Sequence, residues 1–175
     1  IDPGAASLER VMRGGFAARR LVVSERPGFE AFELLVETVR RASLPSAVVD
    51  TVAAVAGRMA VAEQAVHGGA REHLHELAGL DTAVDLVGCA ALLFALSPGR
   101  VMASPPALGR GSVRTAHGTV DVPVPAVLAI LRGLPIAGGC EREAGELTTP
   151  TGAALFAELV DDVGPLPAGR LGAVG

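Results

Sequence analysis

Aromatic side chains make up only 3% of this 175-residue chain, whereas hydrophobic residues of all kinds make up 50% of it. The core must therefore be built mainly from alanine, valine and leucine, which favours closely packed helices and short strands. A chain of this length predicts one domain, residues 1–175, with a core of its own. We expect the α+β class: a helix-rich single domain with a small mixed sheet and short β-hairpins. Within it, residues 28–97 should form a helical subdomain and residues 98–175 a strand-loop-helix part.

Hydrophobic spacing and the positions of glycine and proline give the expected elements. Two short strands should flank Gly14-Gly15 within residues 1–24, because a glycine pair can adopt the positive φ of a hairpin turn. Further elements should follow in the order helix, helix, helix, strand, glycine-rich loop and β-ribbon. Their expected ranges are residues 30–41, 45–67, 80–96, 100–108, 109–111 and 112–124, with the ribbon turning near His117-Gly118.

The expected helices have apolar faces at helical spacing. Ser43 and the proline after it should start the second helix, and Gly68-Gly69 should end it. The faces expected to be buried are Phe32, Leu35, Val36 and Val39 in the first helix, Leu80, Val84, Val87 and Ala91 in the third, and Leu155, Phe156 and Leu159 near the C-terminus.

Charge and composition exclude several classes of function. The chain contains no lysine, so its 15 basic residues are arginines, and a phosphate loop that needs the lysine of GK[ST] is excluded. A net charge of −4 without tryptophan or tyrosine lacks the basic, aromatic surface of a nucleic-acid binder. The longest apolar run, residues 86–96, is too short to span a bilayer, and no signal peptide is evident. We therefore expect a cytoplasmic protein with no nucleic-acid or membrane partner.

The two cysteines, Cys89 and Cys140, are far apart and lack CxxC spacing, which indicates neither a zinc knuckle nor a redox pair. Cys89 lies in the apolar run LVGCAALLFAL and is expected to be a small core residue. Cys140 lies in the polar stretch GGCEREAGE, where it is either an exposed thiol or a soft metal ligand.

Two histidines and four carboxylates lie between Glu72 and Asp85, in the stretch EHLHELAGLDTAVD. Imidazole nitrogens and carboxylate oxygens together suit Zn, Ni, Fe or Co. In an extended conformation His73 and His75 point to the same face, whereas in a helix His73 pairs with Glu76 at i,i+3. The alternative is a solvated helix start with both histidines on the surface.

Other candidate groups are more isolated. His67 should lie in the last turn of a helix, where a histidine interacts favourably with the helix C-terminus, although its nearness to HLHE also allows a ligand role. Asp81 and Asp85 are four residues apart on one helical side, which suits a metal or a proton as well as plain solvation. His117, at the tip of a ribbon, is either a turn residue or a catalyst.

The segment TTPTG predicts a helix start, with Thr149 as the N-cap and Pro150 as the first helical residue. Thr151 and Gly152 complete a first turn that holds no acid. Free N–H groups, threonine hydroxyls and a glycine that permits close approach suit a phosphate or carboxylate. The alternative is a simple cap on an amphipathic helix.

Three segments of the chain, in the same order and with similar spacing, resemble the LarC family of nickel insertion proteins. They are HLHELAGLDTAVDLVG from residue 73, ASPPALGRGSVRTAHGTVDVPVPAVLAIL from residue 103 and GELTTPTGAALFAELVDDVGPLPA from residue 145. Typical members carry HxHEVGALDSIVDIVGAA, ASPxPxGxGxVxxAHGxxPVPAPAT and EGELTTPTGAALL. The resemblance covers most of the chain and is looser before Glu72. It implies a role in completing the nickel-pincer nucleotide cofactor of lactate racemase.

The resemblance also implies roles for individual residues. The chain would serve as an enzyme-associated domain, a lyase of the cyclometallase type, that inserts nickel into a pyridinium-dithiocarboxylate mononucleotide with CTP consumed. Soft sulfur atoms of that substrate would take Ni²⁺ from harder protein ligands. The metal would be held or delivered by His73, His75, Glu76 and His117. The nucleotide phosphate would be held by Thr148, Thr149, Thr151 and Gly152, with Arg114 as a counter-charge.

The ends of the chain differ from the family pattern. Typical members open with a DCFSGISGDM-like turn and continue into a domain that resembles a CTP-binding module. This chain begins at IDPGAASLERVMRGG and stops at Gly175, which indicates a fragment, one polypeptide of a split system or a shortened relative. CTP would then be bound only through a missing partner domain.

Two alternative functions follow. One is a shortened relative that performs metal-free chemistry on an anionic or apolar small molecule, with His117, Glu146 and Asp85 as acid–base groups. The other is a non-catalytic nickel chaperone or assembly subunit. Either could act as a homo-oligomer.

Overall fold

The computed structural model describes residues 6–23, 29, 31–68, 79–115, 118–138, 145–170 and 172. The helices in these ranges are α1 (Phe32–Arg41), α2 (Ser46–Val66), α3 (Leu80–Leu96), α4 (Pro125–Ile130) and α5 (Pro150–Leu159). The strands are β1 (Ala6–Arg13), β2 (Phe16–Val23), β3 (Met102–Ala103), β4 (Gly109–Thr115), β5 (Gly118–Val122), β6 (Gly145–Glu146) and β7 (Asp162–Val163). In these ranges, a strand pair, three consecutive helices and three further strands come before the mixed C-terminal part, and the predicted α+β class is confirmed.

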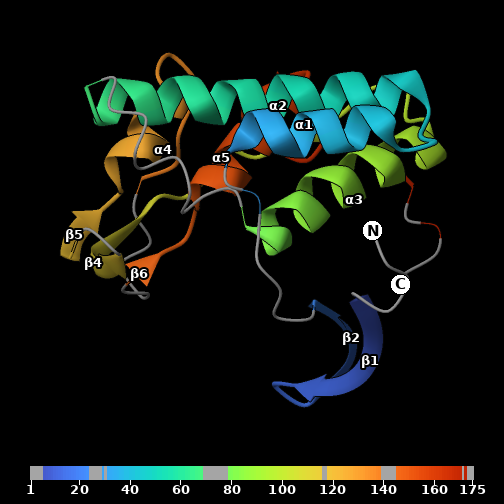
Figure 1. Ribbon diagram of the computed structural model, residues 1–175. Helices are drawn as coiled ribbons and strands as arrows, with labels where there is room; N and C mark the ends of the chain where they lie inside the picture. The colour runs from blue at the N-terminus through green and yellow to red at the C-terminus, as the bar shows by residue number, and fades with distance from the viewer. Residues whose placement is uncertain are drawn as a thin grey trace.

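Helix α2 is the centre of the fold, because it packs against α1, α3, α4 and α5 (Figure 1). Its buried positions include Val48, Val52, Val55 and Met59, which recur at intervals of three or four residues. This spacing places them along one side of a helix, as an amphipathic pattern requires. The long helix thus supplies the surface on which the others assemble.

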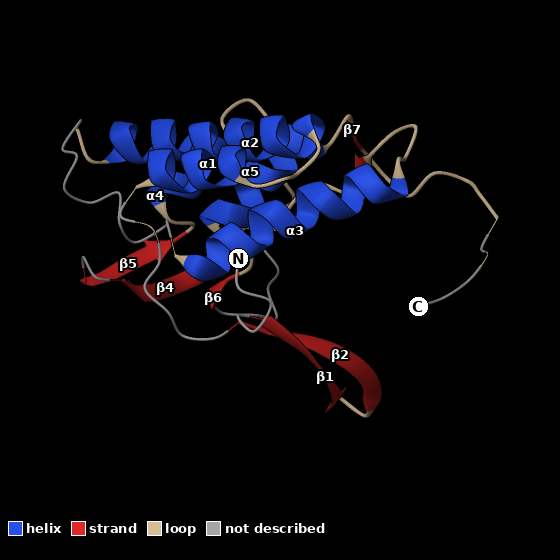
Figure 2. Cartoon of the chain, turned by 45° about the vertical axis from the view of Figure 1, so that its right-hand side comes forward, coloured by secondary structure: helices blue, strands red, loops and turns tan. Residues whose placement is uncertain are grey.

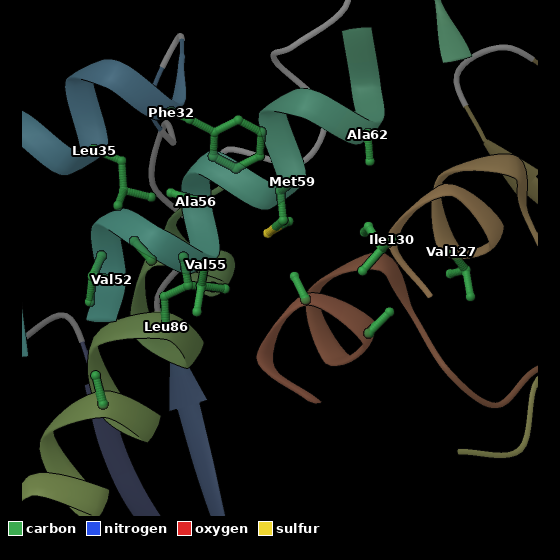
Figure 3. Packing of buried hydrophobic residues seen from close by; sticks show 14 of the residues in the cluster. Phe32, Leu35, Val52, Val55, Ala56, Met59, Ala62, Leu86, Val127 and Ile130 are labelled. Atoms are coloured by element: carbon green, nitrogen blue, oxygen red, sulfur yellow. The ribbon is translucent and has the colours of Figure 1, made fainter. Parts of the chain in front are cut away.

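One hydrophobic core joins residues from all five helices, with Phe32, Leu35, Met59 and Leu86 among its largest fully buried side chains. In Figure 3, Phe32 from α1, Leu86 from α3 and Val127 from α4 lie around the residues of α2. Most of the other buried members are valine and alanine. The core therefore has the aliphatic composition that the scarcity of aromatic residues predicts.

The strands form three small sheets within the described residues. Strands β1 and β2 form an antiparallel hairpin, β3 pairs with β7 in parallel, and β4 lies between β5 and β6 with antiparallel pairing on both sides. The sheet β5–β4–β6 lies beside α4 and near the end of α2 (Figure 1), where it forms part of the candidate site below.

The predicted hairpin around Gly14 and Gly15 is confirmed, and both glycines have positive φ, +54° and +85°. The hairpin extends away from the helices (Figure 2) and touches them through a contact between β2 and α3. It exposes four large apolar side chains: Leu8, Met12, Phe16 and Leu21. Within the described ranges, no helix is long and apolar enough to cross a membrane.

Helix ends were predicted better than helix faces. Helix α3 has both predicted ends, Leu80 and Leu96, but its predicted buried face is wrong. The buried residues are Thr82, Ala83, Leu86 and Ala90, and the predicted face, Leu80, Val84, Val87 and Ala91, is half-buried. The reason is that α3 is apolar on nearly every side, so packing against α2 rather than its own pattern selects the face.

The two other predicted faces had different outcomes. In α1, Phe32, Leu35 and Val39 are buried as predicted, and Val36 is half-buried. In α5 the prediction is wrong, because the small residues Ala153 and Ala154 are the buried ones. The predicted residues, Leu155, Phe156 and Leu159, are half-buried.

Three local predictions are corrected by the backbone. Ser43 does not cap α2, whose N-cap position is Pro45 without a side-chain hydrogen bond. The predicted strand over residues 100–108 is reduced to β3 and an isolated bridge at Ala107. The expected loop at residues 109–111 is the start of β4, because glycines at positive φ let the strand approach β6 closely.

Candidate functional site

A pocket of about 370 Å³ lies where five elements meet: the end of α2, the hairpin β4–β5, the start of α4, strand β6 and the start of α5. Its lining residues are Glu63, Val66, His67, Val113, Arg114, Thr115, Val120, Val124, Pro125, Ala126, Glu146 and Pro150. Most of these side chains are apolar, and the charged groups are few. An apolar concavity with a small number of polar groups is the usual form of a small-molecule site.

The hairpin β4–β5 builds one wall of this pocket. Val113 and Val120 are directly opposite each other in its register, and both line the pocket. The pairing ends at Thr115 and Gly118, and the Thr115 hydroxyl donates to the Gly118 carbonyl at 3.1 Å. The predicted ribbon is therefore confirmed, with two valines forming an apolar surface toward the pocket.

Two ionisable residues from the last turn of α2 contribute a polar edge. Glu63 and His67 are four residues apart, and His67 Nε2 lies 3.2 Å from Glu63 Oε2. Only 8% of the Glu63 side chain and 21% of the His67 side chain are exposed. His67 occupies the C-cap of α2, as expected, and it also contacts a buried carboxylate. Sequence reasoning missed Glu63, although its i,i+4 spacing to His67 was the available signal.

Glu146 is the most unusual group in the pocket. It lies on β6, where it pairs with Gly109 of β4. Its Oε1 is buried and has no hydrogen-bond partner among the described residues. Burial raises the pKa of the Glu146 carboxyl above its ordinary value of 4.5, because the charged form loses contact with water. Buried polar atoms are nearly always paired, so this carboxylate oxygen stands out among the described residues as one that calls for a partner.

The helix start at TTPTG is confirmed as a capped N-terminus beside this pocket. The amide of Gly152 donates to Thr149 Oγ1 at 3.2 Å, and Pro150 is the first helical residue. The Thr148 hydroxyl donates to the Ala107 carbonyl at 2.6 Å, so its proton is committed within the fold. Thr151 lies in the first turn of α5, where backbone N–H groups have no acceptor within the helix. Arg114 adds a nearby exposed positive charge.

The remaining predicted site residues do not join this pocket in the described part of the chain. The metal candidates His73, His75 and Glu76, and the candidate His117, lie outside the described residues, as does Cys140. Asp85 is mostly exposed on α3 and does not line the pocket. Its partial burial and the nearby charge of Asp81 raise the pKa of its carboxyl. Cys89 is a half-buried free thiol rather than a fully buried core residue, and burial raises its pKa. Across the described ranges, no group of three or more His, Cys, Asp or Glu residues is arranged to hold a metal ion.

Comparison with known proteins shows the family to which this chain is similar. A model of the family described as nickel insertion protein matches residues 2–175. A curated relative from Geotalea uraniireducens is 40% identical over 173 residues, which cover 97% of this chain and 44% of the relative. Two relatives are named pyridinium-3,5-bisthiocarboxylic acid mononucleotide nickel insertion protein. One, from Geobacillus kaustophilus, is 38% identical over 81% of this chain and 34% of its own length. The other, from a Nocardioides species, is 37% identical over 99% of this chain and 45% of its own length.

The chain thus spans less than half the length of these relatives. No solved structure matches it.

Proposed function

Because the chain belongs to the nickel insertion protein family, we propose that it takes part in inserting nickel into a pyridinium-dithiocarboxylate mononucleotide. The observation that carries the proposal is the family match over residues 2–175, and the largely apolar pocket edged by Glu63, His67 and Glu146 supports it. In this proposal the chain supplies a metal site and a site for the anionic part of the precursor. CTP is consumed by a partner domain.

The metal and the nucleotide are assigned to different segments. His73, His75 and Glu76 hold Ni²⁺, which is the cargo of the reaction, and His117 helps to deliver it. Imidazole and carboxylate ligands are harder than thiocarboxylate sulfur, so the substrate can draw the metal away from them. The start of α5 holds the phosphate through Thr149 and Thr151, where Gly152 permits a close approach, with Thr148 fixing the loop and Arg114 as a counter-charge.

Calorimetry with Ni²⁺ tests the metal assignment. The wild-type protein is expected to bind about one Ni²⁺, and His73→Ala/His75→Ala should bind it about 100-fold more weakly, because two of its ligands are gone. Affinity should fall as the pH drops through about 6.5, since protonated imidazole cannot coordinate a metal. The melting temperature of the metal-free variant serves as the folding control. Equally weak binding by both proteins would remove the metal from the proposal and favour metal-free acid–base chemistry at Glu146.

Phosphate should raise the melting temperature of the wild type more than that of Thr149→Val/Thr151→Val. Loss of the cap alone lowers stability by about 1 kcal/mol and leaves the response to phosphate unchanged. The single variant Thr149→Ser keeps a hydroxyl at this position and should retain the phosphate-induced rise in melting temperature. Thr51→Val is a matched control, because the Thr51 hydroxyl donates to the Ala47 carbonyl within α2, away from the pocket. Identical phosphate shifts in the wild type and the double variant would reduce TTPTG to a helix cap.

A further inference from the structure

We infer that the pocket between α2, β4–β5 and β6 seats a positively charged aromatic ring, and that the Glu146 carboxylate faces the positive charge of that ring. The inference rests on the proposed function for the class of substrate, a pyridinium mononucleotide. It goes further by assigning the ring to one pocket and its charge to one residue.

The dimensions and walls of the pocket suit a flat ring. Its volume of about 370 Å³ lies at the lower end of the range for small-molecule sites, roughly 300–1,000 Å³. Val113 and Val120 supply the apolar wall from the hairpin, and Val124 with Pro125 supplies the wall from the start of α4. These side chains can contact both the faces and the edges of a ring without offering it a hydrogen bond.

The charges around the pocket favour a ring that is positive and carries anionic substituents. Four charged or titratable residues line it: Glu63, His67, Arg114 and Glu146. Glu63 is already in contact with His67, and Arg114 is exposed at the edge, where it can meet an anionic substituent. Glu146 remains with a buried Oε1 that no described group pairs.

A cationic ligand removes the cost of that unpaired oxygen. An ionised carboxylate in a partly desolvated place is unfavourable unless an opposite charge lies nearby. A pyridinium ring brings this charge without needing a hydrogen-bond donor. A neutral ring of the same shape leaves Glu146 uncompensated, so the pocket should discriminate by ring charge.

Oxidised and reduced nicotinamide mononucleotide test this discrimination, because the two share ribose and phosphate while only the oxidised form has a pyridinium charge. Calorimetry on the full chain without nickel should show that the wild type binds the oxidised form about tenfold more tightly than the reduced form. A ratio of affinities of about tenfold is what a modest attraction between the ring charge and the Glu146 carboxylate would produce. Glu146→Gln, which keeps the shape and removes the charge, should bring the two affinities within about twofold. Asp121→Asn removes an exposed carboxylate of β5 that does not line the pocket, and should retain the preference.

A second readout follows from the raised pKa of Glu146. A cation stabilises the ionised carboxylate, so binding near the pKa of Glu146 should release a proton, seen as a binding enthalpy that depends on the buffer. Glu146→Gln should abolish this dependence. Val120→Phe, which fills the pocket, should weaken binding of both nucleotides.

Equal affinities of the wild type for the two nucleotides would overturn the inference, and so would binding of neither. If the wild type prefers the oxidised nucleotide but does not bind nickel, the ring site is supported and the proposed nickel function is refuted.

Discussion

Gly109→Ala is expected to lower the free energy of unfolding by about 3 kcal/mol, since it combines backbone strain with overlap of packed atoms. Gly109 has a φ of +84°, a conformation that favours glycine. A Cβ there would overlap the carbonyl oxygen of Gly145 and lie 2.9 Å from the amide nitrogen of Leu147. These are backbone atoms, so relief requires β6 to separate from β4. Because β6 carries Glu146, the variant should also lose the preference for the oxidised nucleotide.

Gly57→Ala provides the matched control for this effect. Gly57 lies inside α2, has no positive φ, and a Cβ there would meet nothing within 4 Å. Alanine should therefore stabilise the protein by about 0.5–1 kcal/mol. Urea denaturation of both variants gives the two free energies. A Gly109→Ala protein as stable as the wild type would show that β4 and β6 are not closely paired at this position.

Phe32→Ala is expected to destabilise the protein by about 3–5 kcal/mol. The Phe32 side chain is 2% exposed and packs in the core shared by the helices (Figure 3). A cavity as large as a phenyl ring cannot be filled by neighbours that are mainly valine and alanine, so little of the lost packing is recovered.

Phe94→Ala is the corresponding surface substitution, because Phe94 on α3 is 52% exposed. It should change the unfolding free energy by less than about 1 kcal/mol. Denaturation by urea and by heat should rank the two variants in the same order. Similar losses from both substitutions would mean that Phe32 is not a central member of the core.

The sequence predicts the helices and turns of this fold better than it predicts how they pack against one another. Glycine and proline mark turns and helix ends through local backbone geometry. The hairpin at Gly14-Gly15 and the Thr149 cap, which depend on such local signals, are therefore confirmed. The face of α3 was predicted wrongly, because leucine, valine and alanine surround that helix and only its contact with α2 decides which side is covered. The strand at Gly109 was also missed, since its closeness to Gly145 is a tertiary relation.

The candidate site shows the same division. Glu146 and Arg114 were predicted individually, and the fold places both on one pocket. Glu63 was missed because a glutamate within a helix usually faces solvent, and its burial depends on elements far away in sequence. Asp85 was grouped with Glu146 by residue type alone, whereas the described structure leaves it on the exposed side of α3. The metal assignment at His73 and His75 stays a prediction.

The central place of α2 implies an order in which the molecule opens. Its amide hydrogens are covered by four other helices, so they should exchange with solvent deuterium only when the whole core separates. The β1–β2 hairpin, with few contacts to the helices, should exchange by local opening. Glu63 and His67 stand on the slowly exchanging helix, whereas β4 and β5 form a thinner wall of the pocket. Binding of a nucleotide should therefore slow deuterium uptake in β4 and β5, which form the thinner wall, and change it little in α2.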